Sequence, residues 1–325
     1  EREDIEVLFS NEDLLVVKPL SDNIAPYKND GMVAINNKTA RLAQAHRADI
    51  PSITEEDDMI RTFMDEVSIE NLTATVQHLQ DYGRRQYNTA EAYEAGQWLY
   101  DQFENLGTGL EVEPFEFKYG VNESSPNIIA IQWGTKYPDK YIVCGSHYDS
   151  ERSGHGGQEC PGADDNATGV ATVLETARIL SQYSFECSII YCAFSAEEIG
   201  LVGSEAYASH CVDMGYDIVA YFNNDMNGYL HPGNEIHVDL IYPDNVEVLG
   251  EYYKNVASVY FPEMEVRHIE FTKGDSDHTS FNNKGFMGIY PFEDKDNYSP
   301  YMHTLEDVIG ISVNSFEQSQ RFTQM

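Results

Sequence analysis

Apolar runs that alternate with helical patterns constrain the fold of this chain most. Three of these runs, KYIVC, SIIYC and DIVAYF, begin at residues 140, 188 and 217, and helical patterns follow the first two at residues 166–183 and 198–215. Buried strands that alternate with helices form mainly parallel sheets with helices on both faces. The predicted fold is therefore a three-layer α/β/α sandwich around a mixed, mainly parallel central sheet.

Residues that can bind a metal ion follow these runs directly. His147 follows the first run, Glu197 and Glu198 follow the second, and Asp225 follows the third. In sheets of this kind, ligands bind at the carboxyl ends of the strands, where the loops meet. Imidazole nitrogens and carboxylate oxygens are the ligands that hold hydrolytic zinc. The sequence therefore predicts a metal site at this edge of the sheet.

Two acidic pairs differ in what they indicate when each is read alone. Asp164 and Asp165 lie in PGADDNATGV at the start of a predicted helix, where acidic residues also stabilise the positive end of the helix dipole. Glu197 and Glu198 lie at the end of a buried strand, where adjacent carboxylates are costly unless they bind a cation or a charged partner. We interpret Glu198 as a metal ligand and Glu197 as a free carboxylate that acts as a general base.

Histidines supply the remaining candidate ligands, and spacing alone does not choose between two of them. His147 lies in GSHYDS, where Asp149 can accept the second ring N–H and orient the ring. His278 in SDHTSF and His303 in YMHTLED each offer a further ring nitrogen. Asp225 lies in FNNDMNG, a stretch that is also typical of a turn. Taken together, these residue types form a two-metal hydrolase set.

Six short blocks resemble, in the same order, those of a known family. They are GSHYDS, PGADDNATG, FSAEEIGLVGS, NNDM, SDHTSF and YMHTLED, and they fall within residues 65–325. These blocks resemble the co-catalytic, di-zinc aminopeptidases, in particular those similar to bacterial leucyl aminopeptidases. That family has the zinc exopeptidase fold, which the glutaminyl cyclases share, so the resemblance implies this fold here.

The resemblance implies two zinc ions and five residues that bind them. The implied metal ligands are His147, Asp165, Glu198, Asp225 and His303. Asp165 would bridge the two ions. His147 and Asp225 would complete one zinc site, while Glu198 and His303 would complete the other. The peptide bond after Asp165 is expected to be cis, as it often is in the family.

The resemblance also implies a reaction. Water held between the zinc ions would attack the N-terminal peptide bond of a peptide, with Glu197 as the general base. Asp149 would orient a histidine ligand, and His278 would be structural. The tyrosine that helps bind the oxyanion in some members has no counterpart before SDHTSF, so Lys273 or Tyr290 are the candidates for that donor.

Three rival interpretations remain open at this stage. A single-zinc acyltransferase similar to the glutaminyl cyclases would share the layout. A carboxypeptidase or dipeptidase would need a cationic clamp for the substrate carboxylate, and the basic candidates near the motifs are Arg152, Lys273 and Lys284. A non-catalytic binding domain of this fold would have lost metal ligands, whereas every ligand type is present here.

The charge of the chain argues against several classes of partner. Lysine and arginine number 20 against 55 acidic residues, which gives a formal net charge of −35. This charge argues against nucleic acid and anionic membranes as partners, and no apolar run of 18 residues predicts a membrane span. We expect peptide substrates with a free N-terminus and, from acidity and family habit, a periplasmic or extracellular location.

The N-terminal part of the chain differs from the rest. Residues 1–62 contain short apolar runs between polar turns, and we predict an N-terminal extension of unknown role there. The predicted zinc peptidase domain covers residues 63–325. Its helical patterns begin after Ser68 and from Asn88, where Ser and Asn are typical residues before a helix.

Three further features of the catalytic part can be predicted from its sequence. The C-terminal segment, residues 303–325, is predicted to be mostly helical. Loops 228–234 and 291–301 are expected to line a specificity pocket. The five cysteines are an odd number, so at least one thiol is unpaired.

Overall fold

A computed structural model provides the structure of this chain. It describes residues 5–10, 15–19, 52–107, 109–151, 159–270 and 276–325. The chain divides into two compact units, residues 1–42 and 43–325. In the first unit, β1 (Ile5–Ser10) pairs antiparallel with β2 (Leu15–Pro19).

The second unit begins before the division that the sequence suggested. A boundary after residue 62 falls inside α1 (Asp58–Asp65). Met64 of this helix packs in one apolar cluster with Tyr260 and Phe261. The helix is therefore part of the body that carries the predicted ligands, while the role of residues 1–62 stays a prediction.

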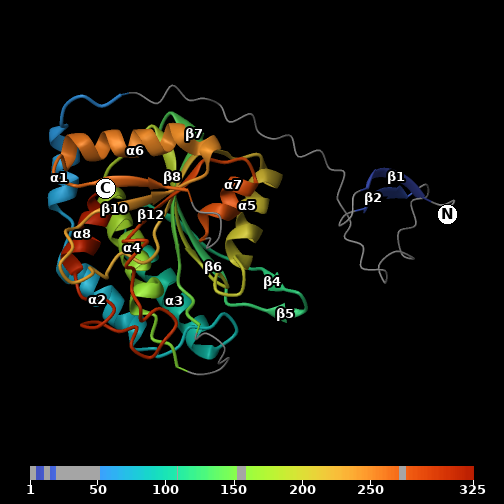
Figure 1. Cartoon of the computed structure of the whole chain (residues 1–325), viewed down its shortest axis with the longest axis horizontal. Helices are drawn as coiled ribbons and strands as arrows, with labels where there is room; N and C mark the ends of the chain where they lie inside the picture. Colours follow the sequence, from blue (N-terminus) through green and yellow to red (C-terminus); the bar gives the residue numbers. More distant parts are fainter. Residues whose placement is uncertain (1–4, 11–14, 20–51, 108, 152–158, 271–275) are drawn as a thin grey trace. The chain divides into compact units, whose positions relative to one another are not determined.

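An eight-stranded mixed sheet forms the centre of the second unit (Figure 1). Its strands, in order across the sheet, are β11 (Val266–Ile269), β10 (Val238–Ile241), β12 (Gly288–Phe292), β9 (Asp217–Asn223), β7 (Tyr137–His147), β8 (Cys187–Phe194), β6 (Asn127–Gln132) and β3 (Glu111–Phe115). The four central strands β12, β9, β7 and β8 run parallel. Beyond them, β10 runs antiparallel to β12, and β6 runs antiparallel to β8. The carboxyl ends of four neighbouring strands therefore meet at one edge.

Helices cover both faces of this sheet (Figure 1). Those after α1 are α2 (Ile69–Gln80), α3 (Ala90–Asn105), α4 (Gly169–Leu180), α5 (Val202–Met214), α6 (Glu247–Tyr260), α7 (His278–Asn283) and α8 (Phe316–Gln324). Ile128 and Ile129 are neighbours in β6, so their side chains point to opposite faces. Ile128 packs with α2, α3 and α4, whereas Ile129 packs with α5 and α7. The predicted three-layer α/β/α arrangement is confirmed.

Two shorter helical segments and a small hairpin complete the second unit. A π-helical segment, η2 (Ala163–Thr168), precedes α4, and a 3₁₀ turn, η3 (Asp244–Val246), precedes α6. β4 (Lys118–Tyr119) pairs antiparallel with β5 (Asn122–Glu123) outside the main sheet. Among the described residues, the structure contains no helix with the length and apolarity that a membrane span requires.

Side-chain caps define where α2 and α3 begin. The Ser68 side chain accepts a hydrogen bond from the amide of Asn71 at the start of α2, as the sequence predicted. The start predicted from Asn88 lies one residue early, because Thr89 is the residue that caps α3, through the amide of Ala92. These caps satisfy amides that the first helical turn leaves without a partner.

The C-terminal segment is less helical than the sequence suggested. Only α8 is an α-helix there, and turns occupy most of residues 303–315. His303 has a φ of 59° and Gly310 a φ of 86°, values outside the right-handed helical region. The non-helical backbone of this segment places His303 and Asp307 beside η2.

Candidate metal centre

Strand ends place most of the predicted ligands together. His147 is the last residue of β7, and it lies opposite Phe194, the last residue of β8. Glu197 and Glu198 follow Phe194 closely in sequence. On the other side, Gly145 of β7 lies opposite Asn223, the last residue of β9, so Asp225 also emerges at this edge. The parallel pairing itself therefore gathers ligands that are far apart in the chain.

Asp165 reaches the same place from η2, which begins with a tight turn. Gly162 has a φ of 56°, and a Cβ at this position would lie 2.5 Å from the carbonyl oxygen of Asp165 and 2.6 Å from Ser150. Only glycine fits this turn without displacement. The peptide bond between Asp165 and Asn166 is cis, as the resemblance implied.

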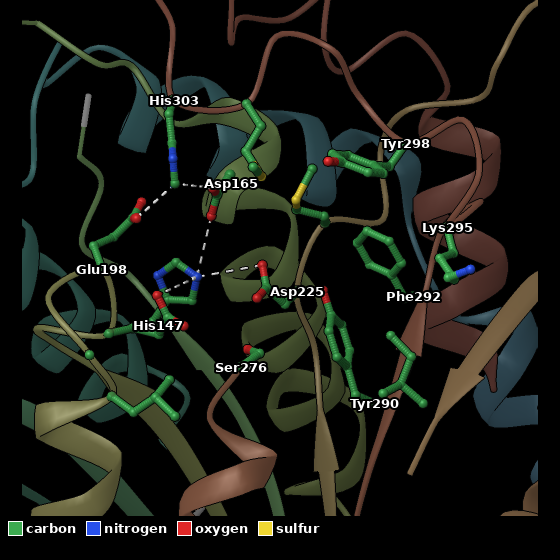
Figure 2. Close-up of a pocket in the computed structure, with 16 residues that line it drawn as sticks. His147, Asp165, Glu198, Asp225, Ser276, Tyr290, Phe292, Lys295, Tyr298 and His303 are labelled. Carbon is green, nitrogen blue, oxygen red and sulfur yellow. Dashed lines mark ion pairs between the residues drawn. The ribbon is translucent and has the colours of Figure 1, made fainter. Parts of the chain in front are cut away.

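The first cluster of donors surrounds the Nε2 atom of His147. This atom lies 3.4 Å from Oδ1 of Asp165 and 3.5 Å from Oδ1 of Asp225 (Figure 2). All three side chains are buried. Oδ1 of Asp225 has no hydrogen-bond partner in the described part of the chain, which is costly for a buried carboxylate oxygen.

The second cluster uses the other oxygen of Asp165. His303 Nε2 lies 3.1 Å from Oδ2 of Asp165 and 2.8 Å from Oε2 of Glu198 (Figure 2). One carboxylate therefore faces both clusters, with one oxygen towards each. This is the arrangement that a bridging ligand between two cations requires.

The donor atoms fit metal ions in number, spacing and chemistry. In each cluster the three donor atoms lie within 4.8 Å of one another. Hydrogen bonds from His303 to Asp165 and Glu198 raise the pKa of His303 to about 11, and burial raises the pKa of Glu198 to about 8. Several buried carboxylates therefore lie close together around two imidazole rings. A bound cation would offset their negative charge, and the buried oxygen of Asp225 would gain a partner.

Asp149 holds three groups of the site in place. Its Oδ1 and Oδ2 accept hydrogen bonds from the backbone amides of Glu197 and Glu198, at 3.1 and 3.3 Å. The same Oδ1 lies 3.6 Å from Nδ1 of His147. The hydrogen bond of this Nδ1 goes to the backbone carbonyl of Asp149, at 3.2 Å. Residue 149 therefore holds the imidazole of His147 as well as the turn that carries both glutamates.

Glu197 lies in the cleft beside the first donor cluster. Its Oε2 lies 4.0 Å from Nε2 of His147, and its side chain is 12% exposed in the cleft. Burial raises the pKa of Glu197 well above its usual range, against the opposing effect of His147. Glu197 takes part in neither donor cluster of the described chain.

Asp307 supports η2, and the sequence analysis did not single it out. Its Oδ1 accepts from the amide of Asp164 at 2.8 Å, and its Oδ2 accepts from the amide of Asp165 at 3.1 Å. Its own carbonyl accepts from the amide of Ala163. Asp307 lies four residues after His303 in YMHTLED, and this closeness to a ligand was the only available signal.

Arg85 is a second supporting residue that the sequence did not reveal. Its guanidinium is fully buried and donates to the carbonyls of Tyr148, Pro161 and Gly162, at 2.6 to 2.8 Å, and to that of Leu79 at the end of α2. All four of these hydrogen bonds go to backbone carbonyls, and none goes to a carboxylate. Arg85 therefore ties the loop after β7 to the turn before η2.

The donor clusters form one side of a cleft of about 570 Å³. Much of the remaining lining, called here the apolar wall, consists of Met226, Ile241, Tyr290, Phe292, Tyr298 and Met302. Lys295 also lines the cleft, and Figure 2 shows it with Tyr290, Phe292 and Tyr298 on the side away from His147 and Glu198. Residues of the predicted loop 291–301 do line the cleft. The predicted loop 228–234 contributes none of the lining residues found in the described part of the chain.

Other predicted residues lie elsewhere or outside the described residues. His278 begins α7, and burial lowers its pKa to about 3, so it is a neutral side chain outside both clusters. Lys284 forms an ion pair with Glu205. Lys273 and Arg152 lie outside the described residues. All five cysteines are free thiols.

An α/β sheet with two His and carboxylate clusters at its carboxyl edge defines a metal-dependent hydrolase. The model of peptidase family M28 matches residues 127–323. The chain therefore belongs to peptidase family M28. This stretch contains every candidate ligand.

Similar proteins agree with this class. A protein of Trichophyton verrucosum described as a probable leucine aminopeptidase is 26% identical over 278 residues, which cover 81% of this chain and 73% of that one. A probable zinc metalloprotease of Pyrenophora tritici-repentis is 26% identical, with 75% of this chain and 67% of that one covered. The crystal structure of LapB from Legionella pneumophila superposes with a TM-score of 0.77 at 22% identity, covering 99% of this chain and 92% of that one.

Proposed function

We propose that this protein is a metallo-aminopeptidase that binds two zinc ions and hydrolyses the N-terminal peptide bond of peptides. The observation that carries the proposal is the shared carboxylate, since Asp165 directs one oxygen to each donor cluster. Relatives described as a leucine aminopeptidase and a zinc metalloprotease support the activity and the metal.

The donors suit zinc better than magnesium or calcium. Each cluster contains one imidazole nitrogen and two carboxylates, a mixed set typical of zinc, whereas magnesium and calcium favour oxygen ligands alone. His147, Asp165 and Asp225 would hold one ion. Two zinc ions bound here would polarise the scissile carbonyl and lower the pKa of a water molecule towards neutrality.

Glu197 would move the protons of the reaction. Its carboxylate lies in the cleft beside the donor clusters, where it can accept a proton from the attacking water. The same group can then donate that proton to the leaving amine. Asp149 holds the backbone of Glu197 and the ring of His147, so it fixes the base relative to one donor cluster.

The cleft is suited to the side chain of one substrate residue. A volume of about 570 Å³ lies within the usual range of ligand pockets. Met226, Ile241 and Phe292 belong to one apolar cluster that lines the cleft together with the donor clusters. An apolar first residue would pack on this apolar cluster, with its peptide bond at the metal centre.

Metal analysis and a substrate panel test this proposal together. Zinc would be counted by elemental analysis, and hydrolysis of aminoacyl-p-nitroanilides would be followed before and after treatment with a chelator. We expect two equivalents of zinc and release that stops with the chelator and returns with zinc. One equivalent without release, together with cyclisation of a glutamine-headed peptide, would instead establish a glutaminyl-cyclase-like acyltransferase. Absence of both metal and activity would leave a binding domain.

We also propose that the protein is exported. The large excess of acidic residues and the resemblance to exported peptidases motivate this proposal. Fractionation of cells that express the complete gene would test it. Detection in the periplasm or the medium is expected, and detection only in the cytoplasm would refute it.

A further inference from the structure

A third cluster of donors lies on the strands behind the apolar wall. Donor atoms of His237, Asp239 and Asp294 lie within 4.8 Å of one another. The guanidinium of Arg267 lies among them, with Nη2 2.8 Å from His237 Nε2, 2.8 Å from Asp239 Oδ2 and 3.5 Å from Asp294 Oδ1. The cation of this cluster is therefore the arginine itself. We interpret the group as an ion-pair network and not as a metal site.

The two ring nitrogens of His237 contact different kinds of partner. Its Nδ1 lies 3.1 Å from the carbonyl oxygen of Glu235, which can only accept a hydrogen bond. Nε2 lies 2.8 Å from Nη2 of Arg267, which can only donate. His237 thus contacts an acceptor with Nδ1 and the guanidinium of Arg267 with Nε2.

Strand register brings Arg267 and the apolar wall together. Asp239 of β10 lies opposite Arg267 of β11 on one side and opposite Phe292 of β12 on the other. Asp239 is fully buried and accepts from Nε and Nη2 of Arg267, at 2.6 and 2.8 Å. Such a paired contact matches the planar fork of the guanidinium, which a lysine cannot reproduce.

The network extends into the segment after β12. The amide of Lys295 donates to Oδ2 of Asp239 at 2.8 Å. Asp294 accepts from the amide of Asp296 at 3.0 Å and from the side chain of Asn297 at 2.9 Å. Asp239 and Asp294, the two carboxylates that face Arg267, therefore also hold the backbone of this segment.

A buried glutamate fixes the two ends of the same segment. Glu293 accepts from the amide of Ser299 at 2.8 Å and from the amide of Tyr229 at 3.0 Å. Residues 293–299 are thus held by the side chain of Glu293 at their ends and by Asp239 in the middle. Lys295 and Tyr298, which line the cleft, lie within this segment.

We propose that Arg267 is a positioning residue that determines which first residue the cleft accepts. Arg267 fixes Asp239, Asp239 fixes Lys295, and the segment then presents Tyr298 beside Phe292 as a rigid wall. A bulky apolar side chain would contact this wall, whereas an alanine side chain would be too short to reach it. This inference rests on the proposed aminopeptidase function.

Arg267→Lys tests the inference, because lysine keeps the charge and loses the paired contact. The values of kcat and KM would be measured for leucyl- and alanyl-p-nitroanilide with zinc-loaded enzyme. We expect KM for the leucyl substrate to rise about 10-fold, with kcat and the alanyl values within about 2-fold of wild type. Zinc content should stay unchanged, because Arg267 touches neither metal cluster.

Arg61→Lys is the matched control. Arg61 pairs with Glu56 through Nε and Nη2, at 2.6 and 2.5 Å, and neither residue lines the cleft. This variant should leave both substrates unaffected. An equal loss on leucyl and alanyl substrates in Arg267→Lys, or no loss at all, would overturn the specificity role.

Hydrogen exchange provides a readout that does not depend on activity. In Arg267→Lys the amides of Lys295, Asp296 and Ser299 should exchange faster than in wild type, while Arg61→Lys should show no change there. Unchanged exchange at these amides would show that Arg267 does not hold residues 293–299 in place. If wild type cleaves neither substrate, the proposed aminopeptidase function fails, and the specificity role fails with it. The exchange result still decides whether Arg267 holds residues 293–299 in place.

Discussion

Asp165 links the two donor clusters, and its role depends on neighbours that a sequence motif does not display. An acidic pair before a helix is common, so PGADDNATG alone did not separate a bridging ligand from helix-end charge. The order of six blocks predicted Asp165, and the structure places one of its oxygens towards His147 and the other towards His303. Motif order identified the candidate, and only the fold shows which atom faces which partner.

Glu197→Gln isolates the proposed proton carrier. Glutamine keeps the size and the backbone contacts with Asp149 but cannot accept the proton of the attacking water. We expect kcat to fall about 10²–10⁴-fold with two zinc equivalents retained. Steady-state kinetics and elemental analysis measure the two quantities. Glu205→Gln on α5 is the control, and full activity in Glu197→Gln would remove this residue from the mechanism.

Arg85→Lys tests whether the buried guanidinium supports metal binding. Lysine retains a positive charge but cannot reach the carbonyls of Tyr148, Pro161 and Gly162 together. We expect zinc affinity to fall about 10–100-fold, the range found when partners of metal ligands are lost. Competition with a chromogenic chelator measures this affinity.

Arg178→Lys provides the control for the Arg85 experiment. Arg178, like Arg85, donates to a backbone carbonyl, that of Glu66. It differs in pairing with the carboxylate of Glu175, and it lies outside the metal centre. An equal loss of zinc affinity in both variants would indicate a general folding defect. Unchanged affinity in Arg85→Lys would show that the loop holds its place without the arginine.

At the scale of elements, the strands were more predictable than the segments between them. The runs before His147, Glu197 and Asp225 became neighbouring parallel strands, since apolar strands and intervening helices leave few other arrangements. η2 was read as an ordinary helix start, whereas its backbone is non-helical at Asp165 and Asn166 and is held by Asp307, which is distant in sequence. Residues 303–325 were predicted to be mostly helical, and only α8 at their end is an α-helix.

Asp307→Asn tests how strongly the C-terminal segment supports η2. Asparagine keeps one side-chain acceptor, so only one of the amides of Asp164 and Asp165 retains its partner. We expect the bridging carboxylate to shift and zinc affinity to fall about 10–100-fold. Isothermal titration of metal-free protein with zinc measures the change. Asp81→Asn on the exposed end of α2 is the control, and wild-type affinity in Asp307→Asn would contradict this role.

At the scale of the whole molecule, the net charge can be counted from the sequence, but the positions of the charged side chains in the fold cannot. The net charge of −35 is visible in the composition, whereas the concentration of carboxylates at one sheet edge appears only in the structure. The apolar wall was equally hidden, because Ile241, Phe292 and Met302 come from three separate stretches. Only the sheet order brings these residues to one side of the cleft.

The excess of 35 negative charges predicts that salt stabilises this protein. Repulsion among like charges disfavours the compact state, and it is screened over about 30 Å at 0.01 M salt but over about 8 Å at 0.15 M. We therefore expect Tm to rise by a few degrees, roughly 2–4 °C for each kcal/mol gained, between these salt concentrations. Scanning calorimetry with zinc-saturated protein measures this shift. The Tm should rise equally with sodium and potassium chloride, because screening depends on ionic strength. A fall in Tm with added salt would show that attractive ion pairs, such as Arg267 with Asp239, outweigh the net repulsion.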